Sequence, residues 1–353
     1  MKLNLFLVDL NFQKLALAFL LIFPITFCSS QNYRNAVAYV NDFGRNETFI
    51  NASMMEYSKT IALISPENRV NKSSTELVDK LLKLNEVLET HDKGFKNDTR
   101  LRDAMIELNT AVSVFMTSKT SDFNDYKSQS LLSIEDITEN FRLKELDIEK
   151  LYQKFRNYEK VKKEFGEQYN IPIKFYSGLN IYEYNTYQNL IFYKINVLDE
   201  KLMFAINNRD LPNIDICKNK IVEICHESLQ KTKLYRDQFI DETLNSANIL
   251  FSNFFLYQDL TLLPITINFF QFSEQFQLLK CKMVIDSSFI PMDDYNKQVR
   301  TYNSLKNNFY DTLYDVNAKK NTLINNWVIT NSSFLKNNCS FDINDYKFLA
   351  EEN

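Results

Sequence analysis

The sequence predicts an all-α protein made of two tandem antiparallel helical bundles, each ending in a long helix. The 353 residues are 45% hydrophobic, which is enough to bury a substantial core. They include only four glycines and six prolines, too few for the tight turns that many short strands require. In two long stretches the apolar residues recur mostly at spacings of three and four, the helical period.

The chain begins with an expected signal peptide at residues 1–30. Lys2 precedes an apolar run at 15–23, and small residues follow at the end of the segment. One interpretation is cleavage after residue 30. The other is lipidation of Cys28, although Phe27 stands where a small residue normally precedes a lipidated cysteine. Both interpretations predict export to the periplasm, the outer membrane surface or the extracellular space.

The N-terminal bundle is expected to occupy residues 31–170. Ser73 with Glu76, and Ser133 with Asp136, have the spacing of capping boxes and are expected to begin helices. The periodicity places the helices of this half at about 33–64, 74–90, 99–118 and 134–169.

Pro172 and Gly178 both oppose helix continuation, so the domain boundary is expected between them. The C-terminal bundle then covers 179–353. Its helices are expected at about 180–207, 213–233 and 236–262, followed by a long helix that begins near Asp293 and runs through Trp327. An aromatic-rich insertion near 258–285 is expected to form a further helix, because Pro264 should kink or end the preceding one.

Two short segments, 101–107 and 235–241, match each other and indicate an internal repeat, each opening the third helix of its half. With Met55-Glu56-Tyr57-Ser58 in the first helix and Leu101-Arg102-Asp103 in the third, residues 31–160 resemble an uncharacterised family of exported, helical bacterial surface proteins. The resemblance implies an all-α fold and a location in the cell envelope or on the cell surface. It implies no activity.

The charges exclude nucleic acid as an expected partner. The net charge is −4, and acidic and basic residues are interspersed without a basic stripe.

No catalytic residue, metal ligand or cofactor is predicted. Glu223 and His226 have the Glu-x-x-His spacing of di-iron bundles, but such sites need this motif twice and the chain has only two histidines. The pairs Arg102-Asp103 and Arg236-Asp237 suit a buried paired site or, as we expect, first-turn charges of two helices. We therefore expect a protein that is not an enzyme.

Four cysteines follow the signal segment: Cys217, Cys225, Cys281 and Cys339. An even number in an exported chain is compatible with two disulfides. Cys217 and Cys225 should lie about 12 Å apart on one helix, too far to pair with each other. Buried free thiols are the alternative.

The aromatic insertion carries the candidate contact surface, Phe269, Phe270 and Phe272. Either these rings are buried as core or they form an exposed patch for a partner, ligand or membrane.

The function expected from the sequence is a non-catalytic interaction or structural protein of the cell envelope, bound to an unknown protein or envelope component. The alternative is a membrane-active protein that uses the apolar segment 249–279. A full transmembrane span is disfavoured because polar residues such as Asn253 and Asn268 interrupt the apolar run.

Overall fold

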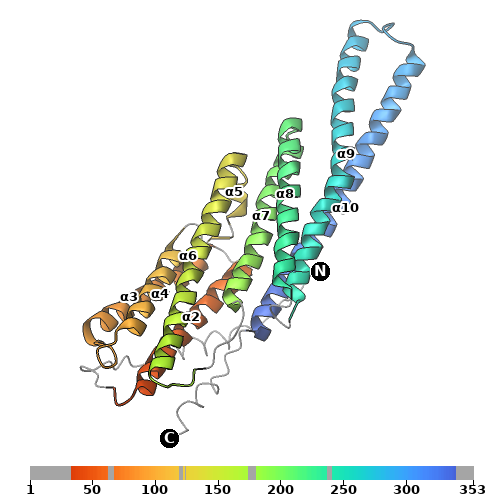
Figure 1. Ribbon diagram of the computed structural model, residues 1–353. Coiled ribbons are helices and arrows are strands. Elements are labelled where there is room, and N and C mark those ends of the chain that lie inside the picture. The colour runs from red at the N-terminus through yellow and green to blue at the C-terminus, as the bar shows by residue number, and fades with distance from the viewer. Residues whose placement is uncertain are drawn as a thin grey trace, which may run out of the picture.

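The computed structural model describes residues 33–62, 67–118, 122–123, 125–173, 180–236 and 241–338 (Figure 1). Within these ranges the chain forms nine helices and no strand, which confirms the all-α prediction. Residues 1–30, with Cys28, and Cys339 lie outside the described residues. The helices are α2 (Ala36–Ala62), α3 (Glu67–His91), α4 (Arg100–Thr117), α5 (Tyr126–Gln129), α6 (Ile134–Gln168), α7 (Ile181–Asn207), α8 (Leu211–Tyr235), α9 (Thr243–Ile285) and α10 (Met292–Asn338).

Local capping sets several of the helix starts. Ser133 precedes α6, and its Oγ accepts a hydrogen bond from the backbone N–H of Asp136 at 3.1 Å, as the sequence predicts. Asn180 caps α7 by accepting from the N–H groups of Tyr182 and Glu183. These side chains replace the intrahelical acceptors that the first N–H groups of a helix lack.

The predicted start of the second helix at Ser73 is wrong. α3 begins at Glu67, so the Ser73–Glu76 pair lies inside the helix. Serine and glutamate each cost less than about 1 kcal/mol in a helix interior relative to alanine. A capping pattern alone therefore does not exclude residues before it from the helix.

The predicted end of a helix at Pro264, with a further helix after it, is also wrong, because one helix of 43 residues, α9, runs through this proline. A proline within a helix costs about 3 kcal/mol, since one backbone hydrogen bond is lost. The turns that follow bury Phe269, Phe270 and Phe276. Each buried phenylalanine contributes about 1.5–3 kcal/mol, which offsets the cost of the proline.

The repeat prediction fails at its second copy. Leu101 lies in the first turn of α4, as expected. Tyr235, by contrast, ends α8, Arg236 is its extended C-cap, and α9 begins only at Thr243. A match of seven residues was too short to determine where a helix starts.

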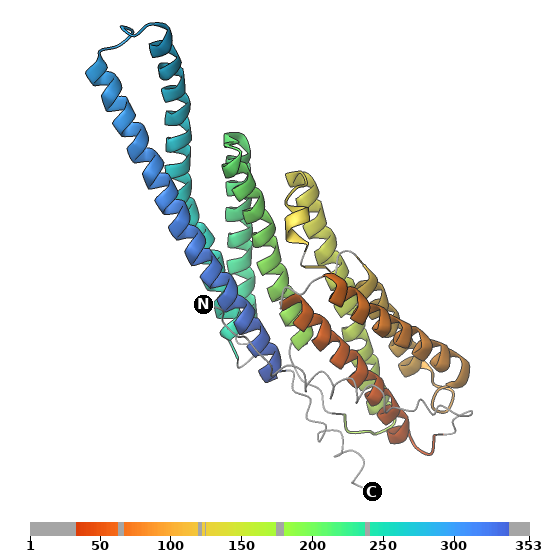
Figure 2. The same ribbon diagram turned by 180° about the vertical axis from the view of Figure 1, so that it is seen from behind.

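The long helices lie roughly side by side in one slanted array, with the α9–α10 hairpin extending past the ends of the others (Figures 1 and 2). α7 lies inside the array and contacts α2, α5, α6, α8, α9 and α10. Most of its side chains are consequently buried, including polar ones.

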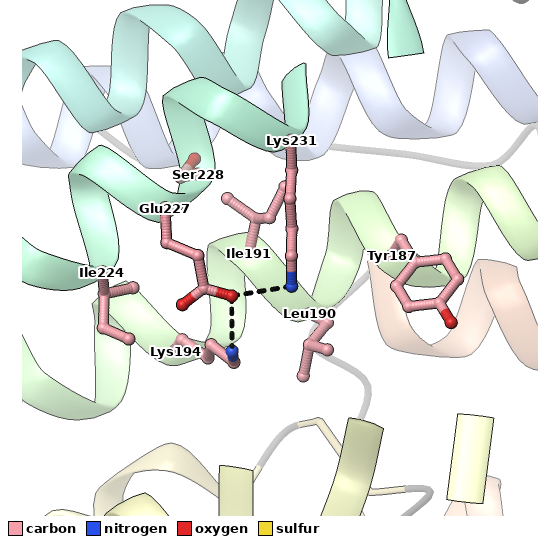
Figure 3. A pocket seen from close by; sticks show the side chains of 8 residues that line it. All are labelled: Tyr187, Leu190, Ile191, Lys194, Ile224, Glu227, Ser228 and Lys231. Carbon is pink, nitrogen blue, oxygen red and sulfur yellow. Dashed lines mark ion pairs between the residues drawn. The ribbon is translucent and has the colours of Figure 1, made fainter. Parts of the chain in front are cut away.

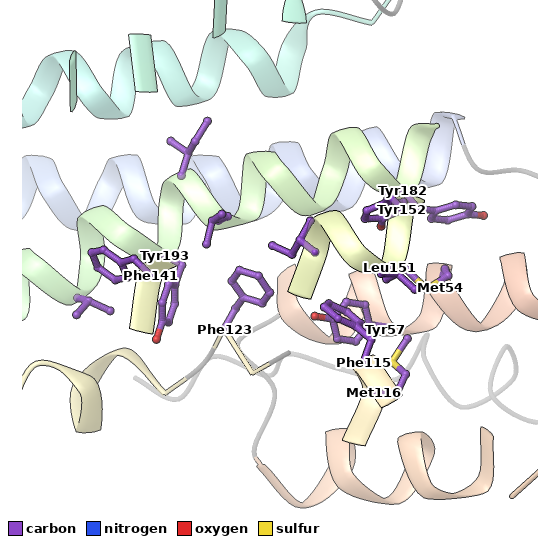
Figure 4. Packing of buried hydrophobic residues seen from close by; sticks show 14 of the residues in the cluster. Met54, Tyr57, Phe115, Met116, Phe123, Phe141, Leu151, Tyr152, Tyr182 and Tyr193 are labelled. Carbon is purple, nitrogen blue, oxygen red and sulfur yellow. The ribbon is translucent and has the colours of Figure 1, made fainter. Parts of the chain in front are cut away.

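One hydrophobic core connects the two halves of the chain. Its buried residues come from helices between α2 and α10, and Figure 4 shows part of it around Tyr57, Tyr152 and Tyr193. The Tyr152 hydroxyl on α6 lies 2.8 Å from the Thr186 Oγ on α7, so a buried hydrogen bond crosses the predicted boundary.

Candidate functional site

The predicted contact residues lie on α9 where it packs against α10. Phe269 and Phe270 are buried, at 1% and 6% exposed, and Phe272 is half-buried. The ring centroids of Phe269 and Phe270 lie 5.2 and 5.4 Å from that of Phe309 on α10. Two of the three candidate rings therefore belong to the core, and their role in partner contact stays a prediction.

The turn between α7 and α8 marks where the body of the molecule ends along α9. Arg209 in this turn donates a hydrogen bond to Ser273 Oγ at 3.1 Å. Its guanidinium carbon also lies 5.7 Å from the centroid of the Phe269 ring and 5.4 Å from that of Phe270. Beyond this contact α9 and α10 continue as a hairpin, which we call the arm and define as residues 274–306 (Figures 1 and 2).

An aromatic seam closes the arm. Tyr295, Tyr302 and Phe309 repeat every seven residues on α10, the spacing that keeps one side of a helix against its partner. Phe276 on α9 stacks on Tyr302, with centroids 4.8 Å apart, and on Tyr295, at 6.1 Å. Among the described residues, the two helices of the arm therefore bury these rings against each other without contact from other helices.

The end of the arm carries exposed apolar side chains. Val284 and Ile285, in the last turn of α9, are 81% and 87% exposed, and Phe289 and Met292 are 47% and 57% exposed. We call these four residues the tip. The sequence reasoning missed them, although the apolar residues on both sides of an Asp-Ser-Ser turn were a visible signal.

The turn between Ile285 and Phe289 is held by hydrogen bonds within the turn itself. Asp286 accepts hydrogen bonds from the backbone N–H and the Oγ of Ser288, at 2.9 and 2.6 Å, and these bonds lower the pKa of its carboxyl group. The ammonium of Lys282 lies 5.0 Å from the centroid of the Phe289 ring. The tip is thus held in place by local contacts.

The exposed residues of the arm below the tip are mostly polar. They include Glu274, Gln275, Gln277, Lys280 and Lys282 on α9, and Asn296, Lys297, Arg300, Thr301, Asn303, Ser304 and Lys306 on α10. Leu278, 62% exposed, is the main exception.

A second candidate is a small cavity between α7 and α8. Lys194, Glu227 and Lys231 are among the residues that line it (Figure 3). Lys194 lies 3.6 Å and Lys231 2.7 Å from Glu227. Both ammonium groups also bind Glu145 on α6, at 2.6 and 3.0 Å. Burial raises the pKa of Glu145, but the two lysines outweigh it and hold that pKa below its usual value.

The volume of this cavity, about 10 Å³, is about enough for one water molecule. The charges that line it are already paired with one another. The cluster is therefore suited to tying α6 to α7 and α8, and a substrate would not fit.

Buried amides form a third feature, a network between α7, α9 and α10. Asn331 exchanges hydrogen bonds with Asn185 and Asn189, at 2.6 and 3.0 Å. Asn248 bonds Gln188 and Trp327. Since each unpaired amide would cost about 1–3 kcal/mol when buried, the network favours a single alignment of the three helices.

The remaining residues considered from the sequence are not brought together. Glu223 and His226 are exposed on α8, and Glu223 pairs with Lys220 at 2.8 Å. In the described ranges no group of three or more His, Cys, Asp or Glu is placed to hold a metal ion. Arg102 pairs with Asp103 at 2.7 Å, Arg236 is exposed, and Asp237 lies outside the described residues.

Three cysteines are described, and all are free thiols. Cys217 and Cys225 are buried in α8, and burial raises the pKa of their thiols to about 11 and about 12. Cys281 is exposed on the arm. Cys217 and Cys225 both lie in α8, so they share one helix, as the sequence predicts.

None of the described helices has the length and apolar character needed to cross a membrane. Comparisons of the chain with models of known protein families, with curated proteins and with solved structures gave no match. The fold and the site therefore rest on the residues themselves.

Proposed function

We propose that this chain is an exported protein of the cell envelope or cell surface that binds a partner without catalysis, and that the arm presents its contact surface. The observation that carries the proposal is the exposed tip at the end of a hairpin that projects past the other helices (Figures 1 and 2). Exposed apolar side chains that cluster on an otherwise polar surface mark contact sites. The proposed location rests on the signal segment and on the family resemblance given above.

Two tandem bundles form the finer part of this proposal. The long helices α6 and α10 each close one half of the chain, as the two-bundle organisation requires. The shared core and the Tyr152–Thr186 contact indicate that the two units are fused along α6 and α7. In this arrangement the body serves as a rigid support for the arm.

The rival function, membrane activity through residues 249–279, requires α9 to leave the body. Phe251, Phe255 and Leu262 on this segment are buried, and Asn248, the residue just before it, belongs to the amide network. Exposing all of them would cost several kcal/mol. We therefore favour an arm that acts while the body stays folded.

The experiment is affinity capture from an envelope extract of the source cells with residues 31–353 as bait. The test variant is Val284→Asn/Ile285→Asn/Phe289→Ser. The matched control, Leu131→Asn/Leu234→Asn/Leu250→Asn, replaces three other exposed apolar residues, which are 71%, 73% and 62% exposed. We expect an envelope component that is retained by wild type and control and lost by the test variant. Equal retention by all three proteins would refute the role of the arm.

A further inference from the structure

We propose that the partner of the tip is a phospholipid surface, into which the four tip residues insert shallowly and end-on. This inference rests on the proposed function and names its ligand class. It differs from the rival above because no helix leaves the body and because residues 284–292, rather than 249–279, make the contact.

The first argument is access. The tip lies at the far end of the arm in both views, so no other part of the described chain stands between it and a flat surface (Figures 1 and 2). Val284 and Ile285 are the most exposed of the large apolar side chains that the structure describes, at 81% and 87%.

The second argument is that the arm is complete without a protein partner. Its helices are closed by the seam around Phe276 and Tyr302, and its turn is held by the Asp286–Ser288 hydrogen bonds. The exposed tip is thus not a half-built core awaiting a subunit. Four side chains on a convex end also fall short of the roughly 800 Å² per partner that a stable protein interface buries. Lipid tails, being fluid, can surround a small convex end.

The third argument is the distribution of charge. Lys280 and Lys282 precede the end of α9 by five and three residues, and Lys297 and Arg300 follow the start of α10 by five and eight. At 1.5 Å per residue they lie about 4–12 Å below the helix ends. With the tip in the headgroup layer, the long side chains of these cations can reach the phosphates.

Acidic residues set the limit of insertion. Asp286, Asp293 and Asp294 lie next to the tip residues in the chain, and taking carboxylates into hydrocarbon is costly. Between residues 278 and 300 these three acids nearly balance the four basic residues. Apolar insertion, rather than net charge, therefore drives binding, and neutral lipid is sufficient.

The experiment is flotation of residues 31–353 with neutral phosphatidylcholine vesicles and with vesicles containing anionic lipid, at low and high salt. We expect binding to both kinds of vesicle, with less than a threefold change between the salt concentrations. The variant Val284→Asn/Ile285→Asn/Phe289→Ser should bind at least tenfold less. The control Leu131→Asn/Leu234→Asn/Leu250→Asn should bind as wild type, and circular dichroism should verify that all three are folded.

An environment-sensitive fluorophore on Cys281 gives an independent readout. The thiol is exposed four residues before the end of α9, whereas Cys217 and Cys225 are buried, and Cys339→Ser removes the fourth thiol. Adding neutral vesicles should shift the emission to the blue, because the tip carries the probe to the interface.

Four results would overturn the proposal. The first two are absence of vesicle binding and binding only to anionic vesicles with loss at high salt. The third is vesicle binding that survives the tip substitutions. The fourth is self-association that the tip substitutions abolish, which would make a second copy the occupant. The proposed function would survive if the same variant still lost its partner in affinity capture.

Discussion

The indole Nε1 of Trp327, on α10, donates a hydrogen bond to Oδ1 of Asn248, on α9, at a distance of 2.8 Å. Trp327 is the single tryptophan of the chain and is 2% exposed. The Asn248 amide also donates to the backbone carbonyl of Gln188 on α7 at 3.2 Å. One side chain therefore joins the three helices that support the arm.

Replacing this asparagine tests the amide network. Asn248→Ala leaves the buried indole N–H without an acceptor, so we expect the free energy of unfolding to fall by about 1–3 kcal/mol or more. Denaturant unfolding followed by circular dichroism measures the loss. In a double-mutant cycle with Trp327→Phe, which removes the same donor, the two losses should be less than additive. Additive losses would show that the bond carries no stability.

The two interpretations of the aromatic segment are separated by replacing Phe269, Phe270 and Phe272 together by serine. Because Phe269 and Phe270 are buried against Phe309, we expect the core outcome, a large loss of thermal stability. Phe269→Ser alone should cost at least about 3 kcal/mol. Phe289→Ser, at the exposed tip, should stay within about 0.5 kcal/mol of wild type. Unchanged stability with lost partner binding would instead make these rings a contact site.

Two carboxylates, Glu183, which is buried, and Glu145, which is half-buried, should give pH dependences of opposite sign. Burial raises the pKa of Glu183 above 4.5, and its ion pair with Arg156 at 2.5 Å does not fully offset this. Its folded form therefore binds its proton more tightly than its unfolded form. The stability it contributes is present below pH 4.5 and is lost as the pH rises through the raised pKa.

Glu145 should behave in the opposite way, since Lys194 and Lys231 hold its pKa below 4.5 despite its burial. Its contribution is present above pH 4.5 and is lost as the pH falls through the lowered pKa. Urea unfolding of wild type, Glu183→Gln and Glu145→Gln between pH 3.5 and pH 7 compares the two. Slopes of the same sign for the two differences from wild type would contradict the assignment.

The cysteines should differ in their reactivity. At neutral pH, thiols with pKa values of about 11 and 12 carry almost no thiolate, so Cys217 and Cys225 should react slowly with iodoacetamide in the folded protein. Cys281, being exposed, should react quickly. Mass spectrometry of non-reduced, alkylated peptides measures both rates. A disulfide at Cys217 or Cys225 would show that α8 opens enough to expose these thiols.

The shared core makes a prediction about the two halves. Residues 31–173 and 180–353 expressed separately should each lose the α6–α7 contacts, including the Tyr152–Thr186 bond, and expose apolar surface. We expect each half alone to aggregate or to show reduced thermal stability, and the two halves expressed together to associate. Two independently folded, monomeric halves would instead support separate bundles.

Much of the fold follows from the sequence, because helices are determined largely by local patterns. The 3.6-residue period of α6 and α10 and the cap at Ser133 each depend on residues that lie close together in the chain. The scarcity of glycine likewise favours helix locally, wherever a long stretch contains none. The expected boundaries of α2, α4, α7 and α8 consequently agree with the structure to within about three residues.

Only the tertiary structure decided how these helices use their surfaces. Pro264 lies within α9 because the seam beyond it offsets the lost hydrogen bond, and that seam joins residues separated in the chain by a turn. Apolar character likewise did not distinguish Phe269, which is buried, from Val284 and Ile285, which are exposed at the tip. Burial depends on which helix lies opposite and where that helix ends, and neither is encoded within a single helical turn.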